Sequence, residues 1–421
     1  MAGAISLLRR CRALFFPLLL AVAAPLGAQQ RPLRFEFSHL REPDGLSLRM
    51  VTCFVQDRDG FLWVGTSNGL YRFDGTHFAG FRQHRNQPHS LLNNQVYSVC
   101  EDGQGQIWAA FENGVSRYNK TTGRFRHITA VDGLPLGICK NILRDRAGTV
   151  WFTSRNRGLF GYFPGTGKVK HFPCSPTDST EALRTLPNGL LEDPFRPGLW
   201  MSERHGLRYF DARQRQFTSH LDNPRRLPVF TANSVSALAR DGDYLLIGDV
   251  TDRSILVYDL RGQRIVRRIR PNHPSDRNDF EPSIIVVDQR HNLWVSSWSA
   301  KAFYVDAQTG QVTNLSSPRA GLPTSLGSDM ILAGWQHPDG AIWLGTADGI
   351  TYTNPGRALY ELYDLETSFP ELSDERGIIS FAEDPDGSWW LGTSIRGLLH
   401  YEPNTNALRV YRLPNATAQF P

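Results

Sequence analysis

The chain has 421 residues, of which 40% are hydrophobic, 21% charged and 11% aromatic, and this balance excludes a disordered, collagen-like or coiled-coil protein. Thirty-seven glycines and 26 prolines against four methionines indicate many short elements joined by tight turns, which favours an all-β fold over a helical bundle. The formal net charge of +5 comes from 46 basic and 41 acidic residues spread through the sequence. A nucleic acid is therefore not an expected partner.

The first 28 residues have the pattern of a secretory signal peptide. Arg9, Arg10 and Arg12 precede an apolar run over residues 13–25, and small residues follow up to Ala28. This run is shorter than the roughly 20 residues that a membrane-spanning helix needs, and no later stretch reaches that length. We expect cleavage after Ala28 and a periplasmic or secreted chain without a membrane span.

Four cysteines follow this segment: Cys53, Cys100, Cys139 and Cys174. An even number in an oxidising compartment permits disulfide bonds without requiring them. The first three lie in hydrophobic, strand-like runs, so we expect them to be small buried hydrophobic side chains rather than disulfide partners.

A repeat of about 47 residues fills the rest of the chain. Its clearest copy runs from Asp57 through Gly60 and Trp63 to Thr66. Seven copies keep the tryptophan, at Trp63, Trp108, Trp151, Trp200, Trp294, Trp343 and Trp390. Leu246 stands where one more tryptophan is due, between the fourth and fifth of these. Eight repeats are therefore present.

Each copy contains four short apolar or β-branched runs separated by turn signals. In the second copy the expected strands are residues 95–101, 106–111, 115–118 and 124–128. Four antiparallel strands per repeat of this length are the signature of a β-propeller blade. A tryptophan on the second strand of each blade would fill the wedge to the next blade and bury about 200 Å². The predicted fold class is therefore all-β, a propeller of four-stranded blades.

Residues 33–37 resemble a fourth strand without its preceding three, and they can complete the last blade of a ring. We expect residues 29–354 to form a seven-bladed propeller. The eighth repeat, within residues 355–421, would then be the first blade of an incomplete second propeller. The alternative is a single eight-bladed ring with one surplus strand.

The consensus Asp-x-x-Gly-x-(Ile/Leu)-Trp-(Val/Leu/Ala)-(Gly/Ala)-Thr resembles the two-component regulator propeller repeat, over about residues 33–414. The resemblance implies the periplasmic sensor half of a hybrid two-component system, a group that often governs polysaccharide use. It also implies a sensor kinase or a second propeller as partner. The chain contains no kinase sequence of its own, so we expect a truncated or stand-alone ligand-binding sensor module.

The turns between the second and third strands differ most from repeat to repeat, and all of them lie at one end of the blades. Variation at equivalent turns is hard to explain by packing, and arginines with an aromatic side chain can bind and stack on a sugar that bears carboxylate or sulfate. The predicted ligand-binding residues are Arg155, Arg157, Arg204, His205, Trp298, Lys301 and Arg396. The expected ligand is an oligosaccharide or another small polymer fragment.

Catalytic and metal-binding interpretations find less support. Asp57-x-Asp59-Gly60 and Asp384-x-Asp386-Gly387 resemble calcium loops but lack the third carboxylate and the distal glutamate. We predict no catalytic residues, no metal site and no cofactor. Two alternatives stay open: a protein-interaction scaffold that docks a partner by strand addition, and a propeller lyase or glycosidase.

Overall fold

A computed structural model describes residues 35–40, 50–130, 137–173, 189–316, 326–355, 369 and 377–411, apart from 156, 204, 205, 233, 273, 300, 327, 329, 395, 396, 404 and 406. These residues form eight four-stranded antiparallel sheets, and the helices among them are α1 (Pro274–Asp279) and a 3-10 turn at Pro228–Thr231. The all-β fold class predicted from the sequence is confirmed. The expected signal peptide, residues 1–28, lies outside the described residues.

The first four sheets follow the chain order. Sheet one contains β2 (Val51–Gln56), β3 (Leu62–Thr66), β4 (Gly69–Phe73) and β5 (Phe78–Phe81). Sheet two contains β6 (Ser98–Glu101), β7 (Ile107–Phe111), β8 (Gly114–Asn119) and β9 (Arg124–Ile128). Sheet three contains β10 (Cys139–Arg144), β11 (Val150–Ser154), β12 (Gly158–Phe163) and β13 (Lys168–Phe172). Sheet four contains β14 (Gly189–Glu192), β15 (Gly198–Glu203), β16 (Gly206–Asp211) and β17 (Gln216–Thr218).

The remaining sheets keep the same pattern with one exception. Sheet five contains β18 (Val235–Asp241), β19 (Tyr244–Asp249), β20 (Ser254–Asp259) and β21 (Arg264–Ile269). Sheet six contains β22 (Pro282–Val287), β23 (Leu293–Ser297), β24 (Ala302–Val305) and β25 (Val312–Asn314). Sheet seven combines β26 (Ile331–Gln336), β27 (Ile342–Thr346) and β28 (Gly349–Thr353) with β1 (Ser38–Leu40). Sheet eight contains β29 (Ile378–Glu383), β30 (Trp389–Thr393), β31 (Leu398–Glu402) and β32 (Ala407–Tyr411).

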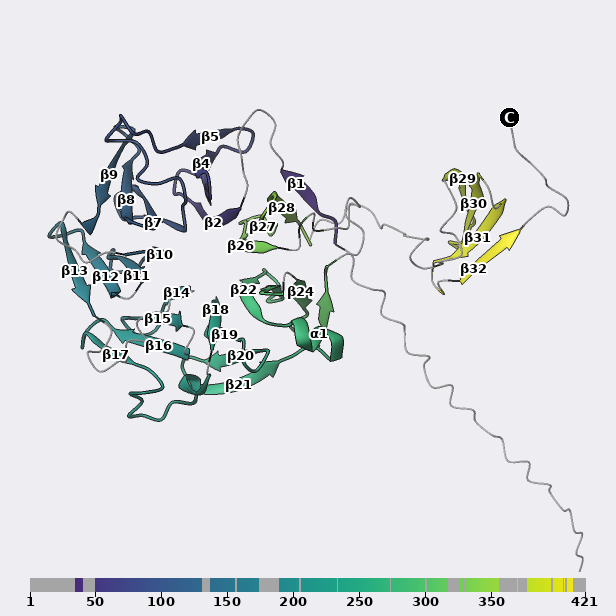
Figure 1. The fold of residues 1–421 in the computed structure, drawn as a ribbon. Helices are drawn as coiled ribbons and strands as arrows, with labels where there is room; N and C mark the ends of the chain where they lie inside the picture. The colour runs from purple at the N-terminus through teal and green to yellow at the C-terminus, as the bar shows by residue number, and fades with distance from the viewer. Residues whose placement is uncertain are drawn as a thin grey trace, which may run out of the picture. The chain divides into compact units, whose positions relative to one another are not determined.

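The first strands of sheets one to seven pack against one another in chain order, and the seventh packs against the first. Figure 1 shows these sheets following one another around a common centre. Strand β1 completes sheet seven by pairing with β28, with His39 opposite Thr351. Val51 of sheet one also packs against Ile350 of sheet seven. Sheets one and seven are therefore neighbours as well.

The closing strand lies slightly later in the sequence than residues 33–37. The ladder with β28 involves Ser38 to Leu40 instead. Phe35 and Phe37 are buried against Trp294 and Tyr304 of sheet six, within the core shared with sheet seven. Their rings therefore fill the gap between two sheets, and the hydrogen-bonded pairing begins after them.

The repeated aspartate and tryptophan form one unit in the hairpins of six sheets. In sheet two, Asp102 Oδ1 accepts the backbone N–H groups of Gln104 and Gln106 at 2.8 and 3.0 Å, which closes the turn. Its Oδ2 accepts the indole N–H of Trp108 at 2.8 Å. The same indole-to-aspartate bond recurs in sheets one, three, four, six and eight. A buried carboxylate with several donors is well satisfied, so the aspartate fixes both the turn and the tryptophan.

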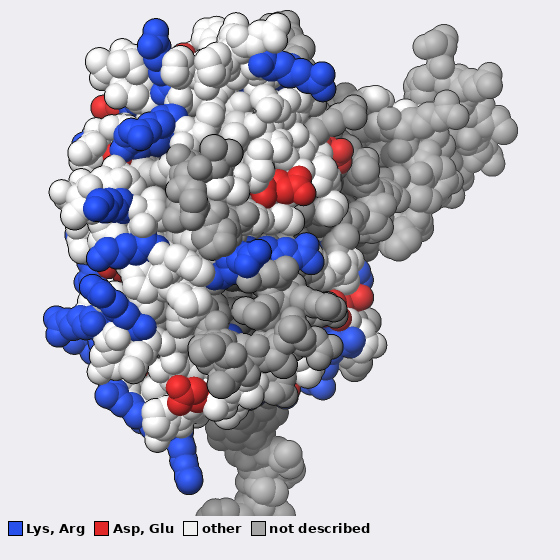
Figure 2. All heavy atoms as spheres, turned by 60° about the vertical axis from the view of Figure 1, so that its left-hand side comes forward, with Lys and Arg blue, Asp and Glu red and all other residues white. Residues whose placement is uncertain are grey.

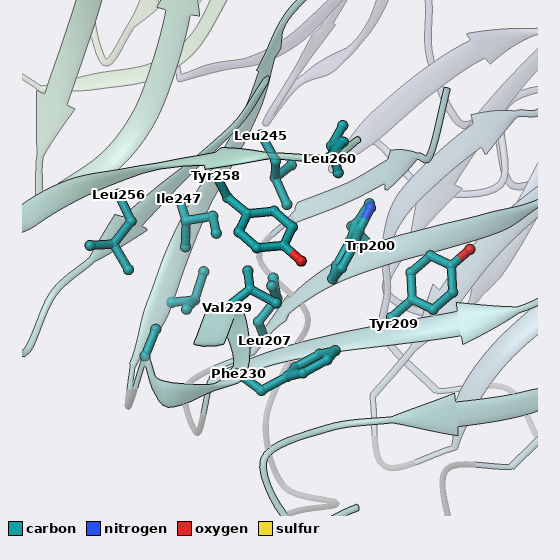
Figure 3. Close-up of a cluster of buried hydrophobic side chains, with 12 residues drawn as sticks. Trp200, Leu207, Tyr209, Val229, Phe230, Leu245, Ile247, Leu256, Tyr258 and Leu260 are labelled. Atoms are coloured by element: carbon teal, nitrogen blue, oxygen red, sulfur yellow. The ribbon is translucent and has the colours of Figure 1, made fainter. Parts of the chain in front are cut away.

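In sheets one to seven, the repeat tryptophan, or Leu246 in sheet five, packs against the next sheet of the ring. Trp108 is fully buried against Cys139 and Ile142 of sheet three. Trp200 lies beside Leu245 and Tyr258 of sheet five, as Figure 3 shows. Leu246 takes the tryptophan's place against sheet six. The cores of the ring are therefore seams between neighbouring sheets, as the wedge interpretation predicts.

Sheet seven departs from the aspartate rule. His337 occupies the aspartate position six residues before Trp343, and its Nδ1 accepts the backbone N–H of Asp339 at 3.2 Å. The imidazole thus replaces one carboxylate oxygen in the turn. Trp343 remains partly buried and packs against sheet one.

The second residue of several aspartate turns reaches into the next sheet. Arg58 of sheet one donates to the carbonyl of Asp102 at 2.8 Å and pairs with Glu101 at 3.2 Å. Arg146 of sheet three likewise pairs with Glu192 of sheet four at 3.0 Å. These polar contacts join blades at the end of the ring where the aspartate turns lie.

The fourth strands carry exposed basic residues, including Arg124 and Arg126 on β9 and Lys168 and Lys170 on β13. Lys and Arg side chains outnumber Asp and Glu on the face drawn in Figure 2. Basic side chains on an unpaired strand edge discourage pairing with another chain. Protection of the strand edge therefore explains the basic residues of the fourth strands, and no ligand is needed to account for them.

Cys53, Cys100 and Cys139 are free cysteines, which agrees with the expectation for these three; Cys174 lies outside the described residues. Burial raises the pKa of Cys53 to about 12 and also that of Cys139 to about 12. The thiols therefore stay protonated at physiological pH and act as small hydrophobic side chains.

Candidate functional site

Four of the seven predicted ligand-binding residues are among the described residues: Arg155, Arg157, Trp298 and Lys301. Arg204, His205 and Arg396 lie outside them. Arg155 and Arg157 flank the β11–β12 turn of sheet three, and both are exposed. Trp298 and Lys301 belong to the β23–β24 turn of sheet six. Sheets three and six are not neighbours in the ring, so the prediction divides into two separate turns.

The turn of sheet six presents an exposed tryptophan. Trp298 is 58% exposed, whereas the other nine tryptophans of the chain are buried or partly buried. Its backbone N–H donates to the carbonyl of Glu281 at 3.1 Å. Ser299 Oγ donates to the carbonyl of Asp279 at 2.6 Å. The indole is therefore held on an anchored turn rather than on a free loop.

Charged groups surround this turn. Lys301 Nζ lies 2.6 Å from Asp279 Oδ2, at the end of α1. Arg253, from the β19–β20 turn of sheet five, donates to Asn278 Oδ1 at 2.9 Å and lies 3.6 Å from Glu281. The connection that contains α1 thus joins the turns of two neighbouring sheets. We name this cluster of Trp298, Lys301, Arg253, Asp279 and Glu281 the α1 face.

Sequence reasoning identified Trp298 and Lys301 but missed the other three members of the α1 face. The connection from β21 to β22 contains α1, but it is shorter than most other connections between blades. No departure from the repeat length therefore marks these residues in the sequence.

Chemically, the α1 face can stack a flat ring on Trp298 and exchange hydrogen bonds through both cations and carboxylates. Nearby, Asp249 ends β19 in a buried position, and this burial raises the pKa of its carboxyl despite the opposing effect of Arg268. The surface offers recognition groups of both signs, which suits a polar, hydroxyl-rich ligand.

The turn of sheet three has a different character. The backbone N–H of Arg155 donates to the carbonyl of Ile138 at 2.8 Å, and His171 Nε2 lies 2.5 Å from the carbonyl of Arg157. These contacts fix the backbone of the turn and leave both guanidinium groups exposed. The arginines stay candidates for an anionic ligand.

One carboxylate cluster has the composition of a metal site. Ligand oxygens of Asp57, Asp59 and Glu101 lie within 4.8 Å of one another. Lys120 Nζ occupies the centre, at 2.7 Å from Asp57 and 2.8 Å from each of Asp59 and Glu101. The ammonium group supplies the positive charge that a cation would bring, so the cluster joins sheets one and two as an ion-pair network.

Two segments of the chain, residues 45–68 and 90–113, match the family model described as "Two component regulator propeller". No curated protein matches the chain at a significant level. Among solved structures, the extracellular domain of a putative hybrid two component system from B. thetaiotaomicron is similar, with a TM-score of 0.71 and 20% identity. That similarity covers 91% of this chain and 50% of the other, so the chain spans about half of its length.

Other propellers share the fold at lower similarity. Virginiamycin B lyase from Staphylococcus aureus has a TM-score of 0.56 and 14% identity over 76% of this chain and 98% of the lyase. The WD40 propeller domain of Doa1 has a TM-score of 0.53 and 10% identity over 77% of this chain and 98% of that domain. At these identities the likeness establishes the propeller architecture alone. In the described part of the chain, no helix is long and apolar enough to cross a membrane.

Proposed function

We propose that this chain, whose repeats are those of the two-component regulator propeller family, is an exported sensor module that recognises an oligosaccharide fragment. The repeat match and the structural similarity to an extracellular sensor domain support the sensor role. The observation that carries ligand recognition is Trp298, a largely exposed indole on an anchored turn beside the charges of the α1 face. Kinase activity would belong to a partner sensor kinase.

A sugar ring that covers the exposed indole removes apolar surface from water, and its hydroxyls can form hydrogen bonds with Lys301 and Glu281. Carboxylate or sulfate groups on the ligand would also pair with Arg253 or with the arginines of sheet three. The α1 face is therefore suited to acidic oligosaccharides more than to apolar ligands.

Calorimetry with galacturonate oligosaccharides, a sulfated chondroitin disaccharide and neutral xylo-oligosaccharides tests this function. We expect at least one acidic fragment to bind, and Trp298→Ala to weaken that binding about tenfold or more, which corresponds to about 1.4 kcal/mol. Stability should change by less than about 0.5 kcal/mol because the side chain is exposed.

Tyr244→Ala provides the matched control. Tyr244 is an exposed aromatic residue at the start of β19, at the other end of the blades. Its removal should leave affinity unchanged. If no fragment binds to the folded protein, oligosaccharide recognition is contradicted. If the wild type and Trp298→Ala bind with equal affinity, the α1 face is not the binding site.

A second proposal concerns the division of the chain into domains. We propose that residues 29–354 form one propeller and that residues 355–421 contain the first blade of a second propeller. All six residues of β29 are exposed, including Ile378, Ile379 and Phe381. In the ring, the equivalent first strands pack against their neighbours. A further sheet of the same repeat, supplied by a second propeller, is the partner that fits this apolar strand.

We expect the chain to capture a protein fragment that contains further repeats of this type. Ile379→Lys should abolish the capture because it places a charge on the apolar strand, and the unfolding midpoint of the ring should stay the same. Equal capture by both versions would contradict the docking role. Lys168→Ile, on an outer strand of the ring, is the control for nonspecific effects of charge.

A further inference from the structure

A cavity of about 610 Å³ lies inside the ring, at the opposite end of the blades from the α1 face. It is lined by the last residues of the first strands of five sheets, β10, β14, β18, β22 and β26. Glu192, Arg240 and Gln336 each stand directly before the turn position that aspartate usually occupies. Strand β22 runs from the Trp298 turn to the cavity and has six residues. At 3.3 Å per residue, the two sites are therefore about 20 Å apart along this strand.

Arg240 supplies the cavity with positive charge. Its side chain is exposed, and among the described residues no hydrogen bond or ion pair engages its guanidinium. Two other arginines at this end of the blades are engaged, since Arg146 pairs with Glu192 at 3.0 Å and Arg58 pairs with Glu101 at 3.2 Å. A guanidinium that lines a cavity and has no ion-pair partner among the described residues is available to bind the carboxylate of a ligand.

The other groups of the cavity restrict the ligand further. Trp335 lines it with a partly buried indole, held edge to face by Trp343 at 6.3 Å between ring centroids. Leu191 and Val286 provide apolar wall. Arg146 neutralises the charge of the Glu192 carboxylate, which can still accept a hydrogen bond from a ligand hydroxyl. The cavity therefore combines a cation, an aromatic surface and a hydroxyl acceptor.

We propose that this cavity binds a small ring-bearing carboxylate, with Arg240 on the carboxylate, Trp335 against the ring and Glu192 on a ring hydroxyl. A volume of this size is within the usual range for ligand pockets. A sugar acid satisfies all three groups, whereas an aromatic acid satisfies Arg240 and Trp335 and leaves Glu192 unused. The site is separate from the α1 face and does not depend on the function proposed there.

Calorimetry and saturation-transfer NMR on the full chain with D-glucuronate, D-glucose, benzoate and acetate test the proposal. We expect glucuronate to bind more tightly than glucose, which lacks the carboxylate, and than acetate, which lacks the ring. Benzoate should be weaker than glucuronate because it offers no hydroxyl to Glu192. Benzoate stronger than glucuronate would assign the site to aromatic acids and overturn the role of Glu192.

Arg240→Gln should weaken glucuronate binding about tenfold or more, and Arg240→Lys should retain part of it because the charge remains. Arg213→Gln, an exposed arginine on the outside of sheet four, is the matched control and should bind as the wild type does. Trp298→Ala should also bind glucuronate normally, which separates this cavity from the α1 face. No glucuronate binding to the folded chain, or equal binding by Arg240→Gln, would overturn the proposal.

Discussion

Replacing Trp108 with alanine is expected to destabilise the ring by about 3–5 kcal/mol, the usual cost of deleting a large buried aromatic side chain. Trp108 is fully buried in the seam between sheets two and three, and its indole N–H donates to Asp102 at 2.8 Å. The substitution would leave a cavity in that seam and remove one donor from a buried carboxylate. Denaturant unfolding monitored by far-ultraviolet circular dichroism measures the loss.

Trp390→Ala is the matched comparison. Trp390 makes the same bond to an aspartate, with Asp384 at 2.8 Å, but it is only partly buried. Its removal should change the unfolding free energy of the ring by less than about 0.5 kcal/mol, because its ring packs against His400 and Tyr411 of its own sheet. Similar losses for the two variants would contradict the idea that the repeat tryptophans act by filling the seams of the ring.

Replacing Lys120 with methionine is expected to destabilise the protein by about 3 kcal/mol at neutral pH, since removal of one partner leaves buried charge uncompensated. Three carboxylates converge on the ammonium group, and the Asp57 side chain among them is fully buried. Lys168→Met, which removes an exposed lysine from an outer strand, should have little effect. Denaturant midpoints of the three proteins compare the two lysines directly.

The effect of Lys120→Met should depend on pH. Burial alone would raise the pKa of Asp57, but hydrogen bonds from Lys120 and Trp63 outweigh it and hold that pKa below its usual value. A lowered pKa stabilises the folded wild type above about pH 4, and the benefit is lost as pH falls through the folded value. In the Lys120→Met variant the ammonium group no longer lowers the pKa of Asp57, so burial raises this pKa with less opposition.

The stability gap between the wild type and Lys120→Met should therefore narrow as the solution becomes acidic. Millimolar Ca²⁺ should also narrow it at neutral pH, because the cation can replace the missing ammonium among three carboxylates. A gap that stayed constant as the pH fell from 7 to well below 4 would contradict an electrostatic contribution of the network.

The repeat made the architecture of this protein predictable from its sequence, because spacing and turn chemistry report local structure directly. In sheet two the predicted strand 124–128 is β9, and the other three predicted strands overlap β6, β7 and β8. The role of the repeated aspartates, in contrast, does not follow from the spacing alone. Their bond to the tryptophan joins residues six positions apart, and only the folded hairpin brings those side chains together.

The candidate sites were harder to predict because they combine residues from several repeats. Trp298 stood out as an aromatic residue in a variable turn, but Arg253 and Glu281 join it only through the connection that contains α1. Arg240 and Trp335 occupy regular strand positions, so their sequence context resembles that of any other blade. Their exposure to a common cavity follows from ring closure, which no local pattern contains.

The pairing of β1 with β28 also has a consequence for the order of folding. His39 and Thr351 are partners across 312 positions of the chain, and His39 Nδ1 lies 3.0 Å from Thr351 Oγ1. Bringing such distant residues together costs about 3 kcal/mol more in loop-closure entropy than forming a ten-residue hairpin. The first six sheets can assemble from local hairpins as they leave the ribosome, but the circle must wait for residues near 353. Until then the first and last sheets of the incomplete ring lack a neighbour. During this interval the chain is most prone to pair with strand edges of other chains.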